Sequence, residues 1–61
     1  MKAEDIHADL LANGWRVVGG NETHLTYKHP QKPGRISLPK TGYLVTASLR
    51  GIERFTGLRF K

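Results

Sequence analysis

Hydrophobic residues recur at helical spacing at the start of the chain. Ile6 and Leu10 lie four residues apart, while acidic residues fill the polar side of the same segment. Ala3 and Leu11 widen the apolar stripe. Acidic residues in a first helical turn also suit the positive end of the helix dipole. The pattern therefore predicts an amphipathic helix over residues 3–12.

A second apolar stripe lies near the other end of the chain, at three residues spaced three apart: Leu49, Ile52 and Phe55. This spacing predicts a second amphipathic helix. Its N-cap is expected to be Thr46 or Ser48, because hydroxyl side chains accept hydrogen bonds from the free N–H groups of a first helical turn. Each helix should end at a glycine, the first at Gly14 and the second at Gly57, because glycine readily adopts the left-handed conformation that ends many helices.

Between the two predicted helices, hydrophobic and polar residues alternate, which is the pattern of a strand with one buried face. We expect three strands, at residues 15–18, 23–29 and 35–38. The segments between them are rich in residues that interrupt strands: Gly19 to Asn21 form a predicted loop and Pro30 to Gly34 a turn, while Pro39 ends the third strand. Residues 40–46 are expected to form a loop before the second helix.

The predicted elements occur in the order helix, strand, strand, strand, helix. Short connections between consecutive strands favour an antiparallel sheet, and two amphipathic helices can bury their apolar stripes by covering the same face of it. A chain this short has room for one hydrophobic core. We therefore expect a single α+β domain over residues 1–61, with the arrangement α-β-β-β-α, both helices on one face of a three-stranded sheet and the other face uncovered.

The uncovered face of the predicted sheet carries an imidazole, cations and hydroxyls. If Leu25 and Tyr27 belong to the core, strand alternation turns the residues beside them towards solvent. The residues expected on this face are His24, Thr26, Lys28, Arg35 and Ser37. Histidine changes its charge near neutral pH, and adjacent cations would hold a phosphate beside it. An ordinary surface histidine without a function is the alternative interpretation.

The other two histidines fit structural roles. His7 borders the apolar stripe of the first helix and is expected to be a partly buried packing residue. His29 has the same strand parity as Leu25 and Tyr27, which places it on the core side near an edge of the sheet. The three histidines do not have the spacing of metal ligands, and the chain contains no cysteine. The sequence therefore implies neither a metal nor a cofactor.

Positive charge is concentrated in the second part of the chain. Residues 1–22 hold two basic against four acidic side chains, whereas residues 23–61 hold eight against one, and the whole chain has a formal net charge of +5. Such a segment favours a polyanionic partner such as RNA, or it simply keeps the surface solvated. No hydrophobic run approaches the roughly 18 residues needed to cross a membrane. We expect a small cytoplasmic domain.

Three segments, in their order and spacing, resemble the HicA toxins, which are small mRNA interferases of bacterial toxin–antitoxin pairs. The segments are Asn13-Gly14-Trp15, Tyr27-Lys28-His29-Pro30 and Lys32-Pro33-Gly34, and the resemblance covers about residues 4–58. It implies a fold like that of double-stranded-RNA-binding domains, an endoribonuclease activity on mRNA, a role in stress response and a cognate HicB-like antitoxin that covers the catalytic surface. The catalytic histidine of the family lies five residues before the histidine of Lys-His-Pro, which corresponds to His24.

The resemblance implies that His24 is a general base that removes a proton from the 2′-hydroxyl of RNA, so that this oxygen attacks the adjacent phosphorus. Lys28, with Arg35 as a second candidate, would stabilise the charge that develops on the phosphate oxygens. Lys40 or a water molecule would protonate the leaving oxygen. Two positions depart from the family. Glu22 replaces a glycine, where its carboxylate would either orient the imidazole or repel phosphate, and Lys40 stands where many members have a histidine.

Two further features bear on RNA binding. Arg50 and Arg54 lie one helical turn apart and form a predicted basic stripe on the second helix, which would either extend the RNA path or contact the antitoxin. Tyr43 is expected to pack against the protein, with stacking on a base as the alternative. Two other functions stay open: a non-catalytic RNA-binding module of the same fold, derived from a decayed toxin, and an adaptor whose basic surface docks an acidic protein.

Overall fold

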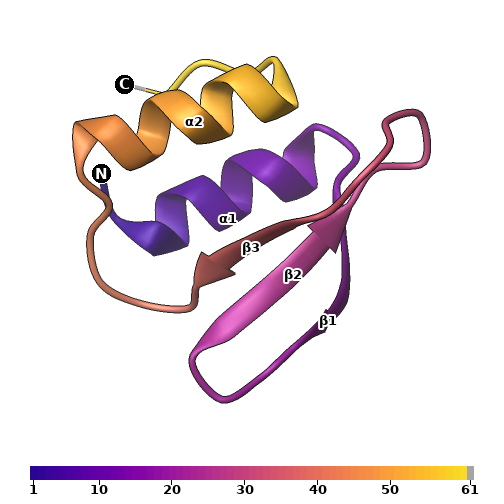
Figure 1. Cartoon of the computed structure of the whole chain (residues 1–61). Coiled ribbons are helices and arrows are strands. Elements are labelled where there is room, and N and C mark those ends of the chain that lie inside the picture. Colours follow the sequence, from indigo (N-terminus) through magenta and orange to yellow (C-terminus); the bar gives the residue numbers. More distant parts are fainter. Residues whose placement is uncertain (61) are drawn as a thin grey trace.

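A computed structural model describes residues 1–60 of the chain, with two helices on one side of a three-stranded sheet (Figure 1). The elements, in chain order, are α1 (Ala3–Ala12), β1 (Arg16–Gly20), β2 (His24–Lys28), β3 (Ile36–Pro39) and α2 (Thr46–Thr56). The predicted α-β-β-β-α arrangement is confirmed, and the first helix has the bounds predicted from the sequence. We call the sheet face that points away from the helices the open face.

The central strand of the sheet is β2, which pairs in antiparallel fashion with β1 on one side and β3 on the other. Leu25 in β2 lies opposite Leu38 in β3, and two residues further along Tyr27 lies opposite Ile36. Residues directly opposite each other project from the same face of a sheet. All four side chains are buried or half-buried. The predicted alternation along β2 and β3 is therefore confirmed, with these residues facing the helices.

The hydrophobic core lies between the helices and the inner face of the sheet. Its largest fully buried side chains are Trp15, Tyr27, Ile6 and Leu10. Two members of the predicted apolar stripes are not in this core. Leu11 is 49% exposed, because it lies about 100° around the helix from Leu10 and so points towards solvent. Phe55 is 40% exposed and packs at the edge of the core, with its ring centroid 5.9 Å from that of Trp15.

Both helices end at the glycines predicted from the sequence. After α1, Gly14 has a φ of 91°, which glycine adopts without steric cost, and the N–H of Trp15 donates to the carbonyl oxygen of Leu10 (3.0 Å). Gly57 follows α2 and its N–H donates to the carbonyl oxygen of Glu53 (2.7 Å).

No helix among residues 1–60 is long and apolar enough to cross a membrane.

The predicted N-caps of the second helix, Thr46 and Ser48, are wrong. Both residues lie inside α2, and Val45 occupies the cap position without a capping side chain. The first helical hydrogen bond runs from the N–H of Leu49 to the carbonyl oxygen of Val45 (3.1 Å). The start of α2 is set by packing, because the buried Leu44 anchors the chain immediately before the cap position.

β1 extends further than the sequence pattern predicts. Gly19 and Gly20, which were expected in a loop, pair with Thr26 and Leu25 of β2. The register shifts between Val17 and Gly19, so that one extra residue is accommodated in β1 as a β-bulge. A bulge interrupts the period of two that identifies a strand, and glycine contributes no hydrophobic signal. The sequence pattern therefore ends before the strand does.

His7 ties α1 to the sheet through both nitrogens of its ring. The side chain is buried (9% exposed), with Nδ1 2.7 Å from the Tyr27 hydroxyl and Nε2 2.8 Å from the Pro39 carbonyl oxygen. A carbonyl oxygen can only accept, so Nε2–H donates to Pro39 and the Tyr27 hydroxyl donates to Nδ1. Burial also raises the pKa of Tyr27 above its ordinary value of 10.0. The predicted packing role of His7 is confirmed, and the ring also links α1 to β2 and β3.

Candidate active site

The open face is built from residues that the strand register places side by side. The facing pairs on this side of the sheet are His24–Pro39, Thr26–Ser37 and Lys28–Arg16. The side chains of His24, Lys28 and Ser37 are exposed, and that of Thr26 is half-buried. Four of the five residues predicted for this face therefore lie on it, in register along two strands. The fifth, Arg35, is exposed and immediately precedes β3.

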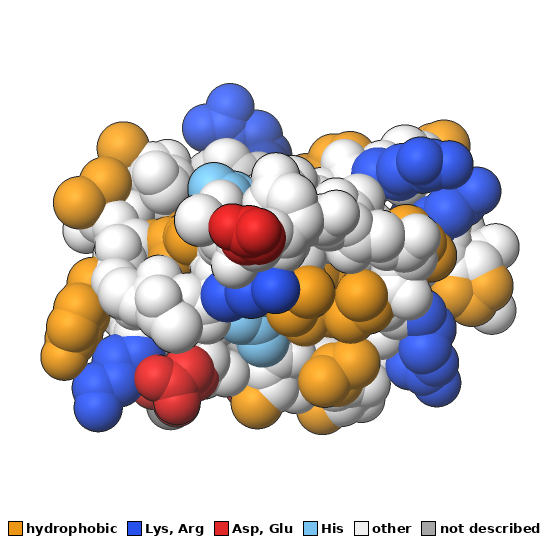
Figure 2. Space-filling model, turned by 90° about the horizontal axis from the view of Figure 1, so that it is seen from below, with side chains coloured by type: hydrophobic (Ala, Val, Ile, Leu, Met, Phe, Trp, Pro, Cys, Tyr) orange, Lys and Arg blue, Asp and Glu red, His pale blue; other side chains and the backbone are white. Residues whose placement is uncertain are grey.

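Figure 2 shows the molecule from below with respect to Figure 1, on the side where the hairpin of β1 and β2 lies. Imidazole groups are visible there together with several separate Lys and Arg side chains, and hydrophobic side chains are exposed between them. Asp or Glu side chains are also visible on this side, so that charges of both signs are mixed with apolar surface there.

A tight turn positions His24 at the end of the hairpin. The side-chain oxygen Oδ1 of Asn21 accepts hydrogen bonds from the backbone N–H of Thr23 (2.9 Å), the backbone N–H of His24 (2.9 Å) and the Thr23 hydroxyl (3.1 Å). The backbone N–H of Asn21 donates to the carbonyl oxygen of His24 (3.0 Å). Asparagine favours such turns because its side chain reaches the backbone of the residues that follow. These hydrogen bonds give His24 a defined position.

The imidazole of His24 is oriented by its neighbour in the turn. Its Nδ1 lies 2.8 Å from the hydroxyl oxygen of Thr23. The side chain is exposed, and within the part of the chain that the structure describes its Nε2 forms no hydrogen bond. Thr23, rather than Glu22, is therefore the residue that orients the ring. One nitrogen is engaged and the other is available to exchange a proton with a ligand.

Gly20 allows the hairpin to close tightly beside His24. Its φ is 141°, in the region that residues with a side chain rarely adopt. A Cβ at this position would collide with the carbonyl oxygen of His24 and lie 3.1 Å from the Cα of Leu25. The close approach of the two backbones at this point requires glycine.

The backbone of Lys40 lies next to the turn that carries His24. His24 lies opposite Pro39, and the backbone N–H of the next residue, Lys40, donates to the carbonyl oxygen of Thr23 (2.8 Å). The side chain of Lys40 is exposed. The register thus brings the start of the β3–α2 connection against the turn that carries the imidazole.

Lys28 and Arg35 lie at the opposite end of the sheet from His24. Lys28 is four residues away along β2, which corresponds to about 13 Å of extended strand. Arg35 precedes Ile36, which pairs with Tyr27 at the same end. The structure therefore does not bring either cation next to the imidazole. Both lie at the same end of the sheet as Arg16, because Arg16 in β1 pairs with Lys28 in β2.

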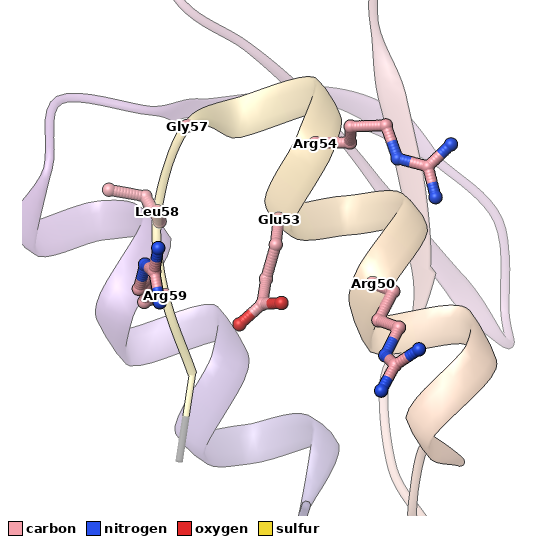
Figure 3. Close-up of a pocket in the computed structure, with 6 residues that line it drawn as sticks. All are labelled: Arg50, Glu53, Arg54, Gly57, Leu58 and Arg59. Atoms are coloured by element: carbon pink, nitrogen blue, oxygen red, sulfur yellow. The ribbon is translucent and has the colours of Figure 1, made fainter.

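Arg50 and Arg54 belong to α2, which lies on the helical side of the sheet and away from the open face (Figure 1). Both project from α2 beside an open cleft of about 480 Å³ (Figure 3), whose lining residues are Arg50, Glu53, Arg54, Gly57, Leu58 and Arg59. The carboxylate of Glu53 accepts a hydrogen bond from the backbone N–H of Phe60 (2.8 Å). The predicted basic stripe is thus present on α2, but it forms a second basic surface apart from His24.

Tyr43 does not pack against the protein as expected. Its side chain is 75% exposed. The residue forms an antiparallel bridge with Lys2, and the following residue, Leu44, is buried. Because successive side chains in extended backbone point in opposite directions, the burial of Leu44 turns Tyr43 outwards. Its ring is consequently accessible to a ligand, in the same connection that begins with Lys40.

Sequence reasoning missed three residues of the site: Asn21, Thr23 and Arg16. A signal existed for Asn21, because asparagine after two glycines is typical of a turn whose side chain accepts backbone hydrogen bonds. Thr23 carries no such signal, since its contact with the ring depends on a side-chain rotamer. Arg16 was assigned to a strand, but its position opposite Lys28 follows only from the register.

Among the residues that the structure describes, no three His, Asp or Glu side chains are grouped so as to hold a metal ion. Neither a scan of protein-family models nor a search of curated proteins finds a match to this chain.

Proposed function

We propose that this chain is an endoribonuclease of the HicA toxin type, which cuts mRNA with His24 as its general base. The main support is the state of that side chain, an exposed imidazole oriented through Nδ1 by Thr23 (2.8 Å) on a face of the sheet that the helices leave open. A general base needs a nitrogen within reach of the proton that it removes. The resemblance of Tyr27-Lys28-His29-Pro30 and the other two segments to HicA toxins points to the same histidine.

The reaction uses a nucleophile that RNA itself supplies. Nε2 of His24 removes the proton of a 2′-hydroxyl, and the 2′-oxygen then forms a bond to the adjacent phosphorus. The bond from phosphorus to the 5′-oxygen of the next nucleotide breaks, and that oxygen takes up a proton. The products are a 2′,3′-cyclic phosphate and a free 5′-hydroxyl. General base catalysis by one side chain is worth about 10²–10⁴-fold in rate.

The register supports different roles for the cations in this proposal. Lys40 follows the residue opposite His24, and so it is the cation suited to stabilise the pentavalent phosphorane and to protonate the leaving 5′-oxygen. Lys28, Arg35 and Arg16 lie about 13 Å along the sheet, where they suit a phosphate further along the strand. Thr26 and Ser37 lie between the two ends and present hydroxyl groups to the sugar-phosphate backbone.

The substrate class follows from this chemistry. DNA lacks the 2′-hydroxyl and is not cut, and the closed major groove of A-form RNA keeps side chains from reading paired bases, so the substrate is single-stranded or locally open RNA. The exposed ring of Tyr43 offers a surface on which a base stacks. The same proposal includes a cytoplasmic location, where messages are translated, and a HicB-like antitoxin that covers the open face and keeps the enzyme inactive.

The test is cleavage of a labelled single-stranded RNA in the presence of EDTA by the wild type and by His24→Ala. We expect the wild type to produce a 2′,3′-cyclic phosphate and the variant to be slower by about 10²–10⁴-fold, with RNA affinity retained. A DNA strand of the same sequence should stay intact. Lys40→Ala and Lys28→Ala form a matched pair, because the first should mainly lower kcat and the second should mainly raise KM.

The same experiment separates the competing functions. If wild type and His24→Ala bind RNA equally and neither cuts it, the chain is a non-catalytic RNA-binding module. If neither binds RNA at moderate salt, the basic surface serves another purpose, such as docking an acidic protein. If His24→Ala cuts as fast as the wild type, the general base is a different residue and the assignment is wrong.

A further inference from the structure

The turn that carries His24 contains a chain of three polar groups whose proton positions can be deduced. Oδ1 of Asn21 accepts two backbone N–H groups, those of Thr23 and His24, each at 2.9 Å. An amide nitrogen in that place would bring N–H groups against N–H groups, so the atom there is the oxygen. An amide oxygen has no proton to donate. Its 3.1 Å contact with the Thr23 hydroxyl therefore exists only if the hydroxyl donates.

The proton on the hydroxyl of Thr23 is thereby committed to Asn21. The second contact of the same oxygen, 2.8 Å to Nδ1 of His24, then has no proton from the hydroxyl. It is a hydrogen bond only if Nδ1–H donates and the hydroxyl oxygen accepts. The neutral imidazole consequently carries its proton on Nδ1 and a free electron pair on Nε2.

The other two histidines show the opposite arrangement. In His7, Nε2–H donates to the Pro39 carbonyl oxygen (2.8 Å) and Nδ1 accepts from Tyr27 (2.7 Å). In His29, Nε2–H donates to the Asn13 carbonyl oxygen (3.1 Å), and Nδ1 accepts the backbone N–H of Gln31 (3.1 Å). The hydrogen bond made by one ring nitrogen determines where the proton of the ring lies. His24 therefore differs from both in a way that the turn imposes.

We infer that Asn21 and Thr23 are positioning residues that hold His24 with its proton on Nδ1, so that Nε2 is the nitrogen that removes the proton of the 2′-hydroxyl. This inference rests on the proposed function for its catalytic consequence, whereas the proton position is a property of the free protein. The Nδ1–H···Oγ1 hydrogen bond persists when the imidazole takes up the proton, because Nδ1 is a donor in both states of the ring. The turn thus keeps the same ring orientation before and after proton transfer.

The first test reads the proton position directly by long-range ¹H–¹⁵N NMR of the three imidazoles, at a pH where all are neutral. His24 should have its proton on Nδ1, and His7 and His29 should have theirs on Nε2. Thr23→Val removes the hydroxyl but leaves both backbone hydrogen bonds to Asn21. It should lower the ratio of the Nδ1–H to the Nε2–H form of His24 about 2- to 10-fold, the range that one net hydrogen bond supports. Thr23→Ser should keep the wild-type ratio.

The second test asks whether the proton position matters for cleavage. Thr23→Val should lower kcat in proportion to the fraction of His24 in the Nδ1–H form, a fall of up to about 10-fold, with KM unchanged, and Thr23→Ser should restore it. A wild-type His24 with its proton mainly on Nε2, or a ratio that Thr23→Val does not change, overturns the inference. So does a normal kcat in a Thr23→Val protein whose ratio has shifted. If the wild type has the expected proton position but cuts no RNA, the proposed function fails and the structural assignment stands.

Discussion

The surroundings of His7 and His24 differ although both residues are histidines that contact the same pair of strands. His7 is buried in the interface between α1 and the sheet, and both of its nitrogens are hydrogen-bonded, to the hydroxyl of Tyr27 and the carbonyl oxygen of Pro39. His24 is exposed at the end of β2, opposite Pro39, and its ring is held through Nδ1 by Thr23. His7 thus contacts the backbone of Pro39 directly, whereas His24 is its partner in the strand register and directs its ring to Thr23.

This difference separates a structural histidine from a reactive one. A buried ring with both nitrogens hydrogen-bonded has no nitrogen left for a substrate, and its loss would leave the hydroxyl of Tyr27 without its partner inside the protein. A ring held on one side and exposed on the other has a fixed direction and a free nitrogen, which is what proton transfer requires. Burial and hydrogen-bond occupancy, rather than residue type, therefore decide which histidine carries the chemistry.

The largest expected effect on stability comes from His7→Ala, and His24→Ala is its matched control. His7→Ala should lower the free energy of unfolding by about 3 kcal/mol, because it leaves a cavity and two unsatisfied polar groups, those of Tyr27 and Pro39. His24→Ala should change it by less than about 0.5 kcal/mol, as is usual for exposed side chains. Urea denaturation at neutral pH measures both values.

The expected loss of stability in His7→Ala is large for so small a protein. A chain of 61 residues has a total stability of about 3–9 kcal/mol, so His7→Ala should be partly or largely unfolded at ordinary temperature. Equal stability of the two variants would contradict the comparison, since it would mean that the buried hydrogen bonds of His7 contribute nothing.

The second prediction concerns the backbone that positions His24. Gly20→Ala should lower the stability by about 1–3 kcal/mol, because its φ of 141° is unfavourable for alanine and its Cβ would collide with the carbonyl oxygen of His24. It should also reduce RNA cleavage, since the turn must move. Gly19→Ala is the matched control, because a Cβ there has no heavy atom within 4 Å among its described neighbours.

Denaturation curves and cleavage rates of the two alanine variants, measured side by side, give the answer. If Gly19→Ala and Gly20→Ala behave alike, the close approach at Gly20 is not what positions the imidazole. A stable Gly20→Ala protein with normal cleavage would have the same consequence.

Most of the fold could be predicted from strand alternation and helical spacing in the sequence. Leu25 and Tyr27 mark the inner face of β2 so clearly that the outward direction of His24 follows, and Ile6 with Leu10 identifies the buried side of α1. These signals are strong because a residue on the wrong face would place a polar group in the core. Where the period is broken, as in the bulge after Val17, the sequence pattern gave no guide to the strand.

The sequence predicted the direction in which His24 points, but it did not predict which residues surround it. Which part of the chain adjoins the His24 turn depends on the register between β2 and β3, which pairs His24 with Pro39 and so brings the backbone of Lys40 to that turn. No local pattern in the sequence encodes this pairing of the two strands. The contact between Thr23 and the ring depends on a rotamer, and it emerges only when Asn21, Thr23 and His24 are seen together in the turn.

The smallest expected effect is a pH dependence of the stability, which comes from Tyr27, the buried hydrogen-bond partner of His7. Burial raises the pKa of Tyr27 above 10.0, so between pH 10.0 and the higher value in the folded protein the unfolded chain has lost a proton that the folded protein keeps. The contribution of this group to stability is therefore fully present below about pH 10 and declines as the pH rises further. Tyr27→Phe removes the group and with it this decline. At neutral pH the same variant should cost about 1–2 kcal/mol, because Nδ1 of His7 loses its donor (2.7 Å).

Urea midpoints of the wild type, Tyr27→Phe and Tyr43→Phe at pH 8 to 11 isolate this effect, because the lysines and arginines are common to all three proteins. Tyr43→Phe removes an exposed hydroxyl and should follow the wild type. A wild type whose stability falls no faster above pH 10 than that of Tyr27→Phe would show that the Tyr27 proton is not held by the fold. Burial of Tyr27 beside His7 would then leave the titration of its hydroxyl unchanged, contrary to this prediction.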